Sequence, residues 1–303
     1  MKKGHMRVHP ASSTPRYPPA QIVAAVDGSP CSHRAVAWAA AEAGLHHCRL
    51  HIVTSMAIPG SPALPPSHLG RQWLRDRGHT IAHRAYRIAR TAPHARPSTT
   101  IHLEVTFDPV IPVLIERSAQ ARILVVGHHG THHRIQCRNP GSVSTAVLHR
   151  AHCPVAVVPA GATVAAPGST RPVTVGIDHS GNSAPAVHTA FDEAARRDVD
   201  LLAVHADDGT TLPPHAPGRQ AATAVLAQAL AGFGERYPDV RVQTVLDTGP
   251  PTSSLLEQSA AAQLLVVGSH GRSELGTLVF GSTSAAVLQS GRLPILVVRP
   301  RQD

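Results

Sequence analysis

The sequence predicts an α/β protein built from two copies of one unit, each an open parallel sheet with helices on both faces. Apolar runs alternate with helical patterns along the chain, and this alternation favours a parallel sheet covered on both sides. The runs ILVVG and LLVVG are apolar at every position, which is typical of strands buried on both faces. The same series of segments also occurs twice, so we expect a tandem duplication.

Each segment of the first half has a counterpart in the second half. QIVAAVDGSPCSHRAVAWAA and PVTVGIDHSGNSAPAVHTAF both contain a β-branched run, an Asp, a Ser-containing turn and an Ala-rich helical pattern. Four further apolar runs recur in the same order, with three helical patterns between the five runs. Named by their first residues, the paired segments are Gln21 with Pro172, Arg49 with Asp200, Thr100 with Val240, Ala121 with Ala262, and His152 with Arg292. Chance similarity between Val-rich runs does not explain this shared order.

These matches divide the chain into four parts. Residues 1–20 begin with charge but have no apolar stretch, so we expect a disordered tail and no signal peptide. Residues 21–159 and 172–300 form the two predicted domains. Residues 160–171 form the linker, because AGATVAAPGST is small, uncharged and contains Pro and Gly. The segment AIPGSPALPPSH from Ala57 is too rich in proline for a helix or a central strand and predicts a flexible crossover.

Composition limits the classes of partner. The net charge is +9 and the sequence pI is about 10.4, but the arginines are scattered and aromatic residues make up 3% of the chain. Few side chains could therefore stack on nucleic-acid bases, and we do not expect nucleic-acid binding. No apolar run approaches the length of a membrane span. The cysteines contain no CxxC motif, which indicates reduced thiols in a cytoplasmic protein; they are Cys31, Cys48, Cys137 and Cys153.

A glycine-rich loop follows the fourth apolar run of the second half. Gly268 and Gly271 bracket a turn, and nine residues separate Gly271 from Gly281, Ser282 and Thr283, where a helical pattern begins. Glycine has no Cβ and lets a ligand approach the main chain, and a helix N-terminus offers N–H groups to phosphate. Ser282 could donate its hydroxyl to a ligand or simply cap the helix. The combination predicts a polyphosphate site.

The order of strand, GxxG, nine-residue spacer and Gly-Ser resembles the universal stress protein family. The resemblance extends over both halves, essentially residues 21–300. It implies, in each half, a five-stranded parallel sheet with strand order 3-2-1-4-5, the adenine nucleotide alpha hydrolase-like fold. It also implies ATP as the ligand, with or without Mg²⁺. This strand order places the topological switch point between strands 1 and 4, where open α/β sheets bind ligands.

The resemblance also implies roles for individual residues. Asp178 would contact the adenosine end of the nucleotide, and the main chain of Val204 would face the adenine. Asp178 could also be a plain turn former after a strand, but Asp27 recurs at the equivalent place. The expected nucleotide-binding residues are Asp178, Val204, Gly268, Gly271, Gly281, Ser282 and Thr283 in the second half and Asp27, Val53, Gly127, Gly130, Gly141 and Ser142 in the first.

The glycine loop of the first half departs from the family pattern. In GHHGTHHRIQCRNPGS, ten residues rather than nine separate Gly130 from Gly141. Pro140 lacks an N–H group, and two adjacent histidines replace small residues. We therefore expect the second half to bind nucleotide better than the first.

Motifs for fast catalysis are absent from the sequence. There is no Gly-Lys-Ser/Thr, no GxSxG and no HExxH. Arg272 or His270 could neutralise phosphate charge, but we identify no catalytic residue and expect at most slow hydrolysis. Three functions remain compatible with the sequence: an ATP-binding stress or regulatory module, a stress protein that works through partner contacts without nucleotide, and a slow ATPase. The altered first loop favours the second of these.

Histidines raise the alternative of a metal site. They crowd the first glycine loop and the end of the following helical pattern, without a recognised ligand spacing, so the metal assignment stays open. The residues are His128, His129, His132 and His133 in the loop and His149, His152 and Cys153 after it.

Two terminal runs predict the assembly. PVAVVPA and PILVVRP resemble the edge strands of the family, which pair between protomers or, in tandem chains, between the two halves. We expect such a pseudo-dimer of halves, because pairing protects an exposed sheet edge. A further dimer of two chains stays open. The arginines of the helical pattern from Arg71 either contact an acidic partner or form a solvated face.

Overall fold

The protein is described by a computed structural model that covers residues 21–57, 68–130, 140–178, 183–206, 217–269, 282–289 and 292–299. In the first repeat the elements are β1 (Gln21–Ala25), α1 (Pro30–Leu45), β2 (Arg49–Ser55), α2 (His68–Thr91), β3 (Ile101–Thr106), α3 (Val110–Ser118), β4 (Ala121–Gly127), α4 (Ser142–Arg150) and β5 (Val155–Val158). In the second repeat they are β6 (Val173–Ile177), α5 (Ala184–Arg197), β7 (Leu201–Ala206), α6 (Pro217–Leu230), α7 (Phe233–Arg236), β8 (Val242–Asp247), α8 (Pro251–Gln258), β9 (Leu264–Gly268), α9 (Ser282–Gln289) and β10 (Ile295–Val298).

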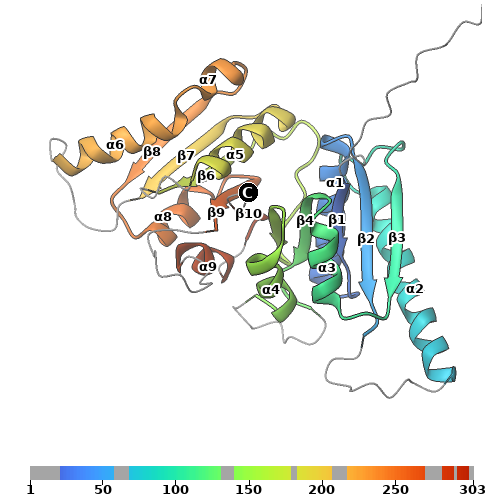
Figure 1. Ribbon diagram of the computed structural model, residues 1–303. Helices are drawn as coiled ribbons and strands as arrows, with labels where there is room; N and C mark the ends of the chain where they lie inside the picture. Colours follow the sequence, from blue (N-terminus) through green and yellow to red (C-terminus); the bar gives the residue numbers. More distant parts are fainter. Residues whose placement is uncertain are drawn as a thin grey trace, which may run out of the picture.

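The strands of both repeats form one ten-stranded sheet in the order β3-β2-β1-β4-β5-β10-β9-β6-β7-β8 (Figure 1). Within each repeat this is the predicted order 3-2-1-4-5, and all pairs inside a repeat are parallel. The fold-class prediction is therefore confirmed.

The two repeats are joined through their last strands. β5 and β10 pair antiparallel, with Ala156 opposite Leu296. This is the expected pairing of the two terminal runs, and it makes the two five-stranded sheets continuous. Without it, both strands would present unpaired N–H and C=O groups at a sheet edge.

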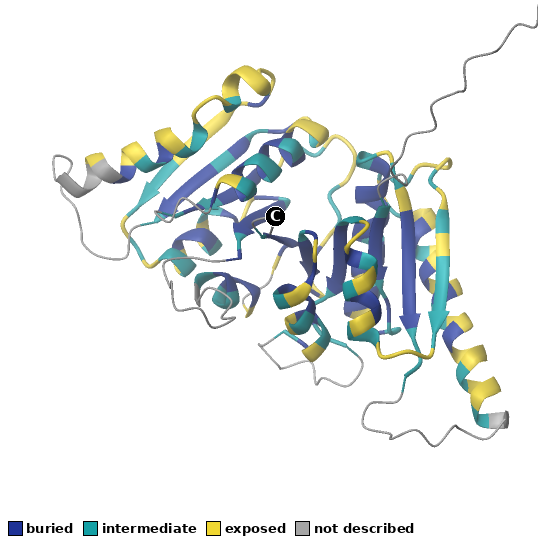
Figure 2. Cartoon of the chain, in the orientation of Figure 1, coloured by how far each residue is buried: buried dark blue, intermediate teal, exposed yellow. Residues whose placement is uncertain are grey.

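Helices cover both faces of the sheet, and successive strand residues enter opposite cores. On β1, Ile22 and Ala24 belong to a core that includes residues of α1, α2, α5 and α6. Val23 belongs to a second core with residues of α3, α4, α8 and α9. Figure 2 shows the buried central strands and the exposed outer faces of the helices. The prediction of strands buried on both faces is confirmed.

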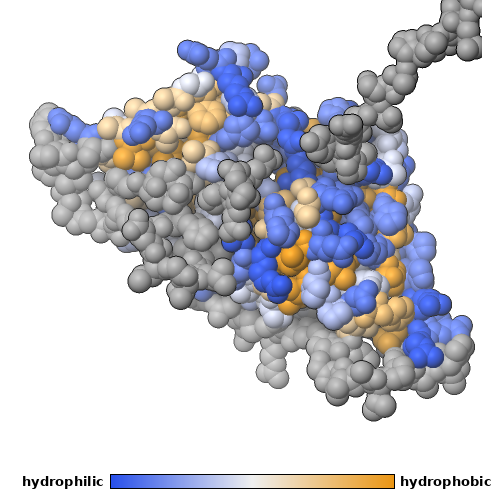
Figure 3. Space-filling view, viewed as in Figure 1, coloured by the Kyte–Doolittle hydropathy of each residue, from blue (hydrophilic) through white to orange (hydrophobic). Residues whose placement is uncertain are grey.

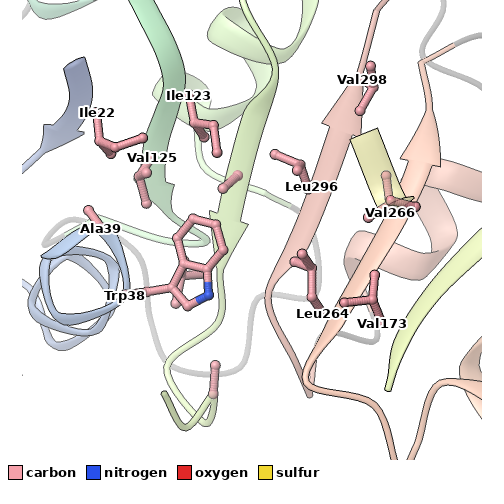
Figure 4. Packing of buried hydrophobic residues seen from close by; sticks show 14 of the residues in the cluster. Ile22, Trp38, Ala39, Ile123, Val125, Val173, Leu264, Val266, Leu296 and Val298 are labelled. Atoms are coloured by element: carbon pink, nitrogen blue, oxygen red, sulfur yellow. The ribbon is translucent and has the colours of Figure 1, made fainter. Parts of the chain in front are cut away.

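The first core continues across the junction between the repeats. Trp38 on α1 and Ile123 on β4 share it with Leu264, Leu296 and Val298 of the second repeat. Figure 4 shows these side chains approaching the junction from both sides. The repeats are therefore held together by apolar packing as well as by strand pairing.

The sequence predicted three helices between the strands of each repeat, but the described residues contain four in the first repeat and five in the second, where α7 and α8 are additional. In the first repeat the additional helix is α3, with the sequence VIPVLIERS. It is short, Pro109 precedes it and Pro112 lies in its first turn, where a missing N–H group is tolerated. Its apolar residues and prolines gave no helical period long enough to recognise.

The helix from Arg71 is present as α2, and its arginines lie on the exposed face opposite Ala82, Ala85 and Ala89. This exposure is compatible with both alternatives, a solvated face and a contact with an acidic partner. On the face of the molecule in Figure 3, hydrophilic and apolar areas are interspersed. In the described ranges, the large apolar side chains that are exposed are Trp73, Tyr86, Phe107 and Val242.

Several other predictions concern segments outside the described residues. These are the tail at 1–20, most of the proline-rich crossover at 58–67, and Cys137. Cys31, Cys48 and Cys153 are free thiols. Across the ranges that the structure covers, no helix is both long and apolar enough to cross a membrane.

The close packing at Gly44 gives a test of the fold. A Cβ at this position of α1 would lie 2.1 Å from the main-chain oxygen of His94. We expect Gly44→Ala to lower the free energy of unfolding by about 1–3 kcal/mol, because the segment after α2 must shift. Gly161→Ala is the control, since no atom lies within 4 Å of its added Cβ. Urea unfolding of both variants measures the difference; equal effects would contradict the packing described.

Candidate functional site

Each repeat contains the topological switch point at which open α/β sheets bind ligands. β1 lies between β2 and β4, and β6 lies between β7 and β9. The helix after β1 packs on one face of the sheet, and the helix after β4 packs on the other. The N-termini of α1 and α4 therefore meet at the carboxyl ends of β1 and β4; we call this place the first crevice, because it is where open α/β sheets bind ligands.

Asp27 lies in this crevice, between β1 and α1. Its Oδ1 accepts a hydrogen bond of 2.9 Å from the N–H of Ser29, and Gly28 takes the left-handed conformation with φ of 85°. Ser29 caps α1 by accepting the N–H of Ser32 at 3.1 Å. Asp27 is thus a turn former, as the simpler interpretation expected.

The other oxygen of Asp27 faces the glycine loop after β4. A Cβ added to Gly130 would lie 2.7 Å from Asp27 Oδ2, so the loop main chain passes directly beside the carboxylate. Gly127 is equally constrained, because its Cβ would lie 2.8 Å from the main-chain carbon of Cys31 on α1. Neither glycine has φ in the left-handed region. At both positions glycine is needed for close approach rather than for unusual φ.

Hydrogen bonds tie the loop to both helices. The main-chain oxygen of His128 accepts the N–H of Gly141 at 2.8 Å, and the main-chain oxygen of His129 accepts the Ser29 hydroxyl at 3.3 Å. The N–H of His128 donates to Val158 on β5 at 3.0 Å. These bonds fix the loop start between the N-termini of α1 and α4.

α4 begins at Ser142, after Gly141 as its N-cap and without a side-chain cap. The N–H groups of a first helical turn have no partners within the helix, and they make this end suitable for an anion. The hydroxyl of Ser144 donates to the main-chain oxygen of Gly127 at 2.7 Å, which joins the helix to the strand end.

An equivalent bond of 3.0 Å runs from Ser284 to Gly268 in the second repeat. We did not predict these two serines as site residues. The sequence signal that could have identified them is Gly-Ser-x-Ser, which occurs as GSVS and GSTS in the two repeats.

The structure describes the second crevice in part. Asp178 directly follows β6, Gly268 ends β9, and Ser282 and Thr283 begin α9. These positions match those of Asp27 and its partners in the first repeat. Gly271, Gly281, Arg272 and His270 lie outside the described residues.

Val53 and Val204 lie inside the sheet. Both are 1% exposed and belong to the second core. The main-chain oxygen of Val53 accepts the N–H of Val26 at 2.9 Å. Beside Val204, the buried His205 has its Nδ1 2.8 Å from the main-chain oxygen of Ile177. With Nδ1 as the donor, this bond fixes the ring orientation at the strand end.

Burial controls the chemistry of the two histidine groups. It lowers the pKa of His128 to about 4, and the charge of His129 acts in the same direction. His128 Nδ1 and His129 Nε2 are 2.8 Å apart. Burial raises the pKa of Cys153 to about 12, so this side chain remains a thiol. His132 and His133 lie outside the described residues.

The histidines after the loop make other contacts. The N–H of His152 donates to the hydroxyl of Ser118 at 2.9 Å, and the main-chain oxygen of His149 accepts the Arg299 guanidinium. Among the side chains that the structure describes, neither histidine group takes part in a cluster of three that could hold a metal ion.

The chemistry of the crevice combines an acceptor with donors. Asp27 offers a carboxylate, and the start of α4 offers main-chain N–H groups. A ligand that uses both would carry hydrogen-bond donors at one end and an anionic group at the other.

The chain was compared with known families and proteins. The model of the universal stress protein family matches residues 20–159 and again residues 169–299. Universal stress protein Rv2005c of Mycobacterium tuberculosis is 37% identical over 286 residues, which cover 92% of this chain and 96% of that protein. Universal stress protein Rv1996 of the same organism is 37% identical over an alignment of 305 positions, gaps included, that covers 93% of this chain and 96% of that protein.

A similar fold occurs among solved structures. The crystal structure of a universal stress protein from Archaeoglobus fulgidus matches with a TM-score of 0.68 and 17% identity, covering 93% of this chain and 97% of that one. The duplicated sheet order and the two family matches lead to the same conclusion: this chain is a member of the universal stress protein family, with two copies of the family domain in tandem.

Proposed function

We propose that the protein binds ATP in the crevice at the carboxyl ends of the first and fourth strands of each repeat. It acts in the cytoplasm as a nucleotide-dependent stress-response or regulatory module without fast hydrolysis. The observation that carries the proposal is the approach of the Gly130 main chain to Asp27 beside the N-terminus of α4.

The donors and acceptors of the crevice match the two ends of the nucleotide. Asp27 and Asp178 would accept hydrogen bonds from the ribose hydroxyls. The phosphates would accept hydrogen bonds from the N–H groups at the starts of α4 and α9, where the helix dipole favours negative charge. Gly127 and Gly130 would keep the start of the loop packed against α1 and Asp27, beside the bound nucleotide, and Gly268 lies at the equivalent strand end of the second repeat. ATP would bring the negative charge that the helix N-termini favour, with or without Mg²⁺.

Regulation would follow from where the helices begin. α1 and α4 both start at the first crevice, one on each face of the sheet. A nucleotide that contacts both helix ends would favour the conformation in which the two ends are close. The nucleotide could shift the conformational equilibrium only by as much as it binds that conformation more tightly than the other one.

The second candidate function is a stress protein that works through partner contacts without nucleotide. It is favoured by the hydrogen bonds that already connect His128, His129, Ser29 and Gly141 in the first repeat. The buried ring of His128 occupies the position that Ser269 has in the second repeat. We therefore propose that the first crevice binds nucleotide more weakly than the second.

The presence of nucleotide is tested on the full chain. We expect mass spectrometry of gently purified, then denatured protein to show adenine nucleotide, and calorimetric titration of stripped protein with ATP to show binding. No released nucleotide and no heat of binding would support the second candidate function instead.

The proposed role of the aspartates is tested by substitution. We expect Asp178→Ala to weaken ATP binding about 10- to 100-fold, since a hydrogen bond to a charged group contributes about 1.5–3 kcal/mol. Asp27→Ala should remove the weaker of the two ATP-binding events, which we assign to the first crevice. Asp247→Ala is the matched control, because Asp247 forms the same turn, accepting the N–H of Gly249 at 3.0 Å, but on the outer strand β8. Equal losses of ATP affinity in all three variants would mean that the substitutions act by disturbing the turns and not by removing a contact with the nucleotide.

A further inference from the structure

Four ionisable side chains meet in the interior between the two repeats. Glu42 lies on α1 and His46 is the C-cap of that helix, whereas Glu193 and Arg197 lie on α5. The side chains of Glu42 and Glu193 are 2% exposed, that of His46 is 1% exposed and that of Arg197 is 6% exposed. We call these four residues the interdomain tetrad.

The tetrad is built from equivalent positions of the two repeats. Counted from Asp27 and Asp178, Glu42 corresponds to Glu193 and His46 corresponds to Arg197. Each repeat thus contributes a glutamate and, one helical turn later, a cationic side chain. The difference is that the second repeat has arginine where the first has histidine.

Each glutamate contacts a cationic side chain from both helices. Arg197 lies 2.5 Å from Glu42 Oε1 and also donates to Glu193 Oε2. His46 Nε2 lies 2.9 Å from Glu193 Oε1 and 3.5 Å from Glu42 Oε2. The four side chains therefore form a closed ring that connects α1 to α5.

The charges of this ring balance in one protonation state. Two buried carboxylates require two positive charges, because an uncompensated buried charge is strongly destabilising. Arg197 is always charged, whereas His46 is charged only when both ring nitrogens carry protons. Burial lowers the pKa of His46, but the adjacent Glu193 and Glu42 carboxylates, which stabilise the charged ring as hydrogen-bond acceptors and by Coulomb attraction, outweigh burial and raise this pKa above 6.5.

The other titratable groups nearby do not replace this proton. Burial raises the pKa of the Cys48 thiol, so it remains neutral. Arg122, Asp192 and Arg196 form a separate group, with Asp192 Oδ2 3.4 Å from Arg122 and 3.7 Å from Arg196. Each of these three side chains is at least 27% exposed, so solvent screens them.

A divalent cation is a poorer occupant than the proton. Glu42, His46 and Glu193 place one oxygen or nitrogen each within 4.8 Å of one another. However, Arg197 already binds both carboxylates, and a dication beside it would leave the buried ring with a net positive charge.

We propose that protonated His46 is a pH-dependent latch between the two repeats. With the proton, the ring is neutral and holds α1 against α5. Without it, the ring keeps an excess negative charge in the interior and the contact between the repeats weakens. This stabilisation is fully present below the pKa of His46 in the unfolded chain, about 6.5, and is lost as pH rises through the higher folded pKa. The latch does not depend on nucleotide binding.

The test compares His46 with arginine at the same position. Urea unfolding is followed by Trp38 fluorescence in full-length protein with Trp73→Phe, at about pH 6 and about pH 9. We expect the urea concentration at the midpoint of unfolding to be lower at about pH 9 than at about pH 6 when residue 46 is His. We expect a smaller decrease in His46→Arg, which places at this position the arginine that the second repeat has as Arg197. His79→Arg is the matched control, because His79 is exposed on α2, and it should keep the full fall. Equal pH dependence in His46 and His46→Arg proteins would overturn the proposal.

A second measurement keeps the proposal testable if His46→Arg does not fold. The nuclear magnetic resonance titration of the His46 ring, assigned by its absence in His46→Gln, should have a midpoint above 6.5; a midpoint below that value would overturn the latch.

The alternative of a metal site is tested by urea unfolding with ZnCl₂ in place of EDTA, which should leave the urea midpoint unchanged. A Zn²⁺-dependent rise that His46→Arg abolishes would replace the proton latch with a metal site.

Discussion

The hydrogen bonds between β5 and β10 are the constraint on which the arrangement of the molecule depends. They turn two sheets into one and continue the apolar core from Trp38 to Leu296. They also bring the last helix of each repeat to the other repeat. The ring of His128 lies against the main chain of Leu288 on α9, and Arg299 donates to the main chain of His149 on α4. The first crevice is therefore in contact with the other half of the chain through His128.

This arrangement gives α1 two separate roles. Its N-terminus, capped by Ser29, holds Asp27 beside the glycine loop, and its C-terminal turns carry Glu42 and His46 into the junction. A single rigid helix thus connects a candidate ligand site with the contact between repeats. In our two separate proposals, nucleotide acts at one end of this helix and a proton acts at the other. Both would bias the same structural element.

Much of the fold could be predicted from the sequence, because the spacing of apolar residues and the order of strand and helix patterns determine it. Runs such as ILVVG indicated buried parallel strands, and the repeated Asp indicated the end of the first strand in each half. The glycines were recognised, but their purpose depends on spatial neighbours: Gly127 lies against Cys31, and Gly130 lies against Asp27. The interdomain tetrad could not be predicted, since its charges come from helices far apart in the chain. Only the equivalence of His46 and Arg197 in the duplication hinted at it.

The most direct test of nucleotide binding is a crystal structure of the full chain grown with ATP. We expect ATP in the crevice between the ends of β6 and β9, with the ribose beside Asp178 and the phosphates at the start of α9. We expect weaker or partial occupancy beside Asp27. ATP bound elsewhere on the chain, or both crevices filled by protein side chains while ATP is in excess, would contradict the central claim.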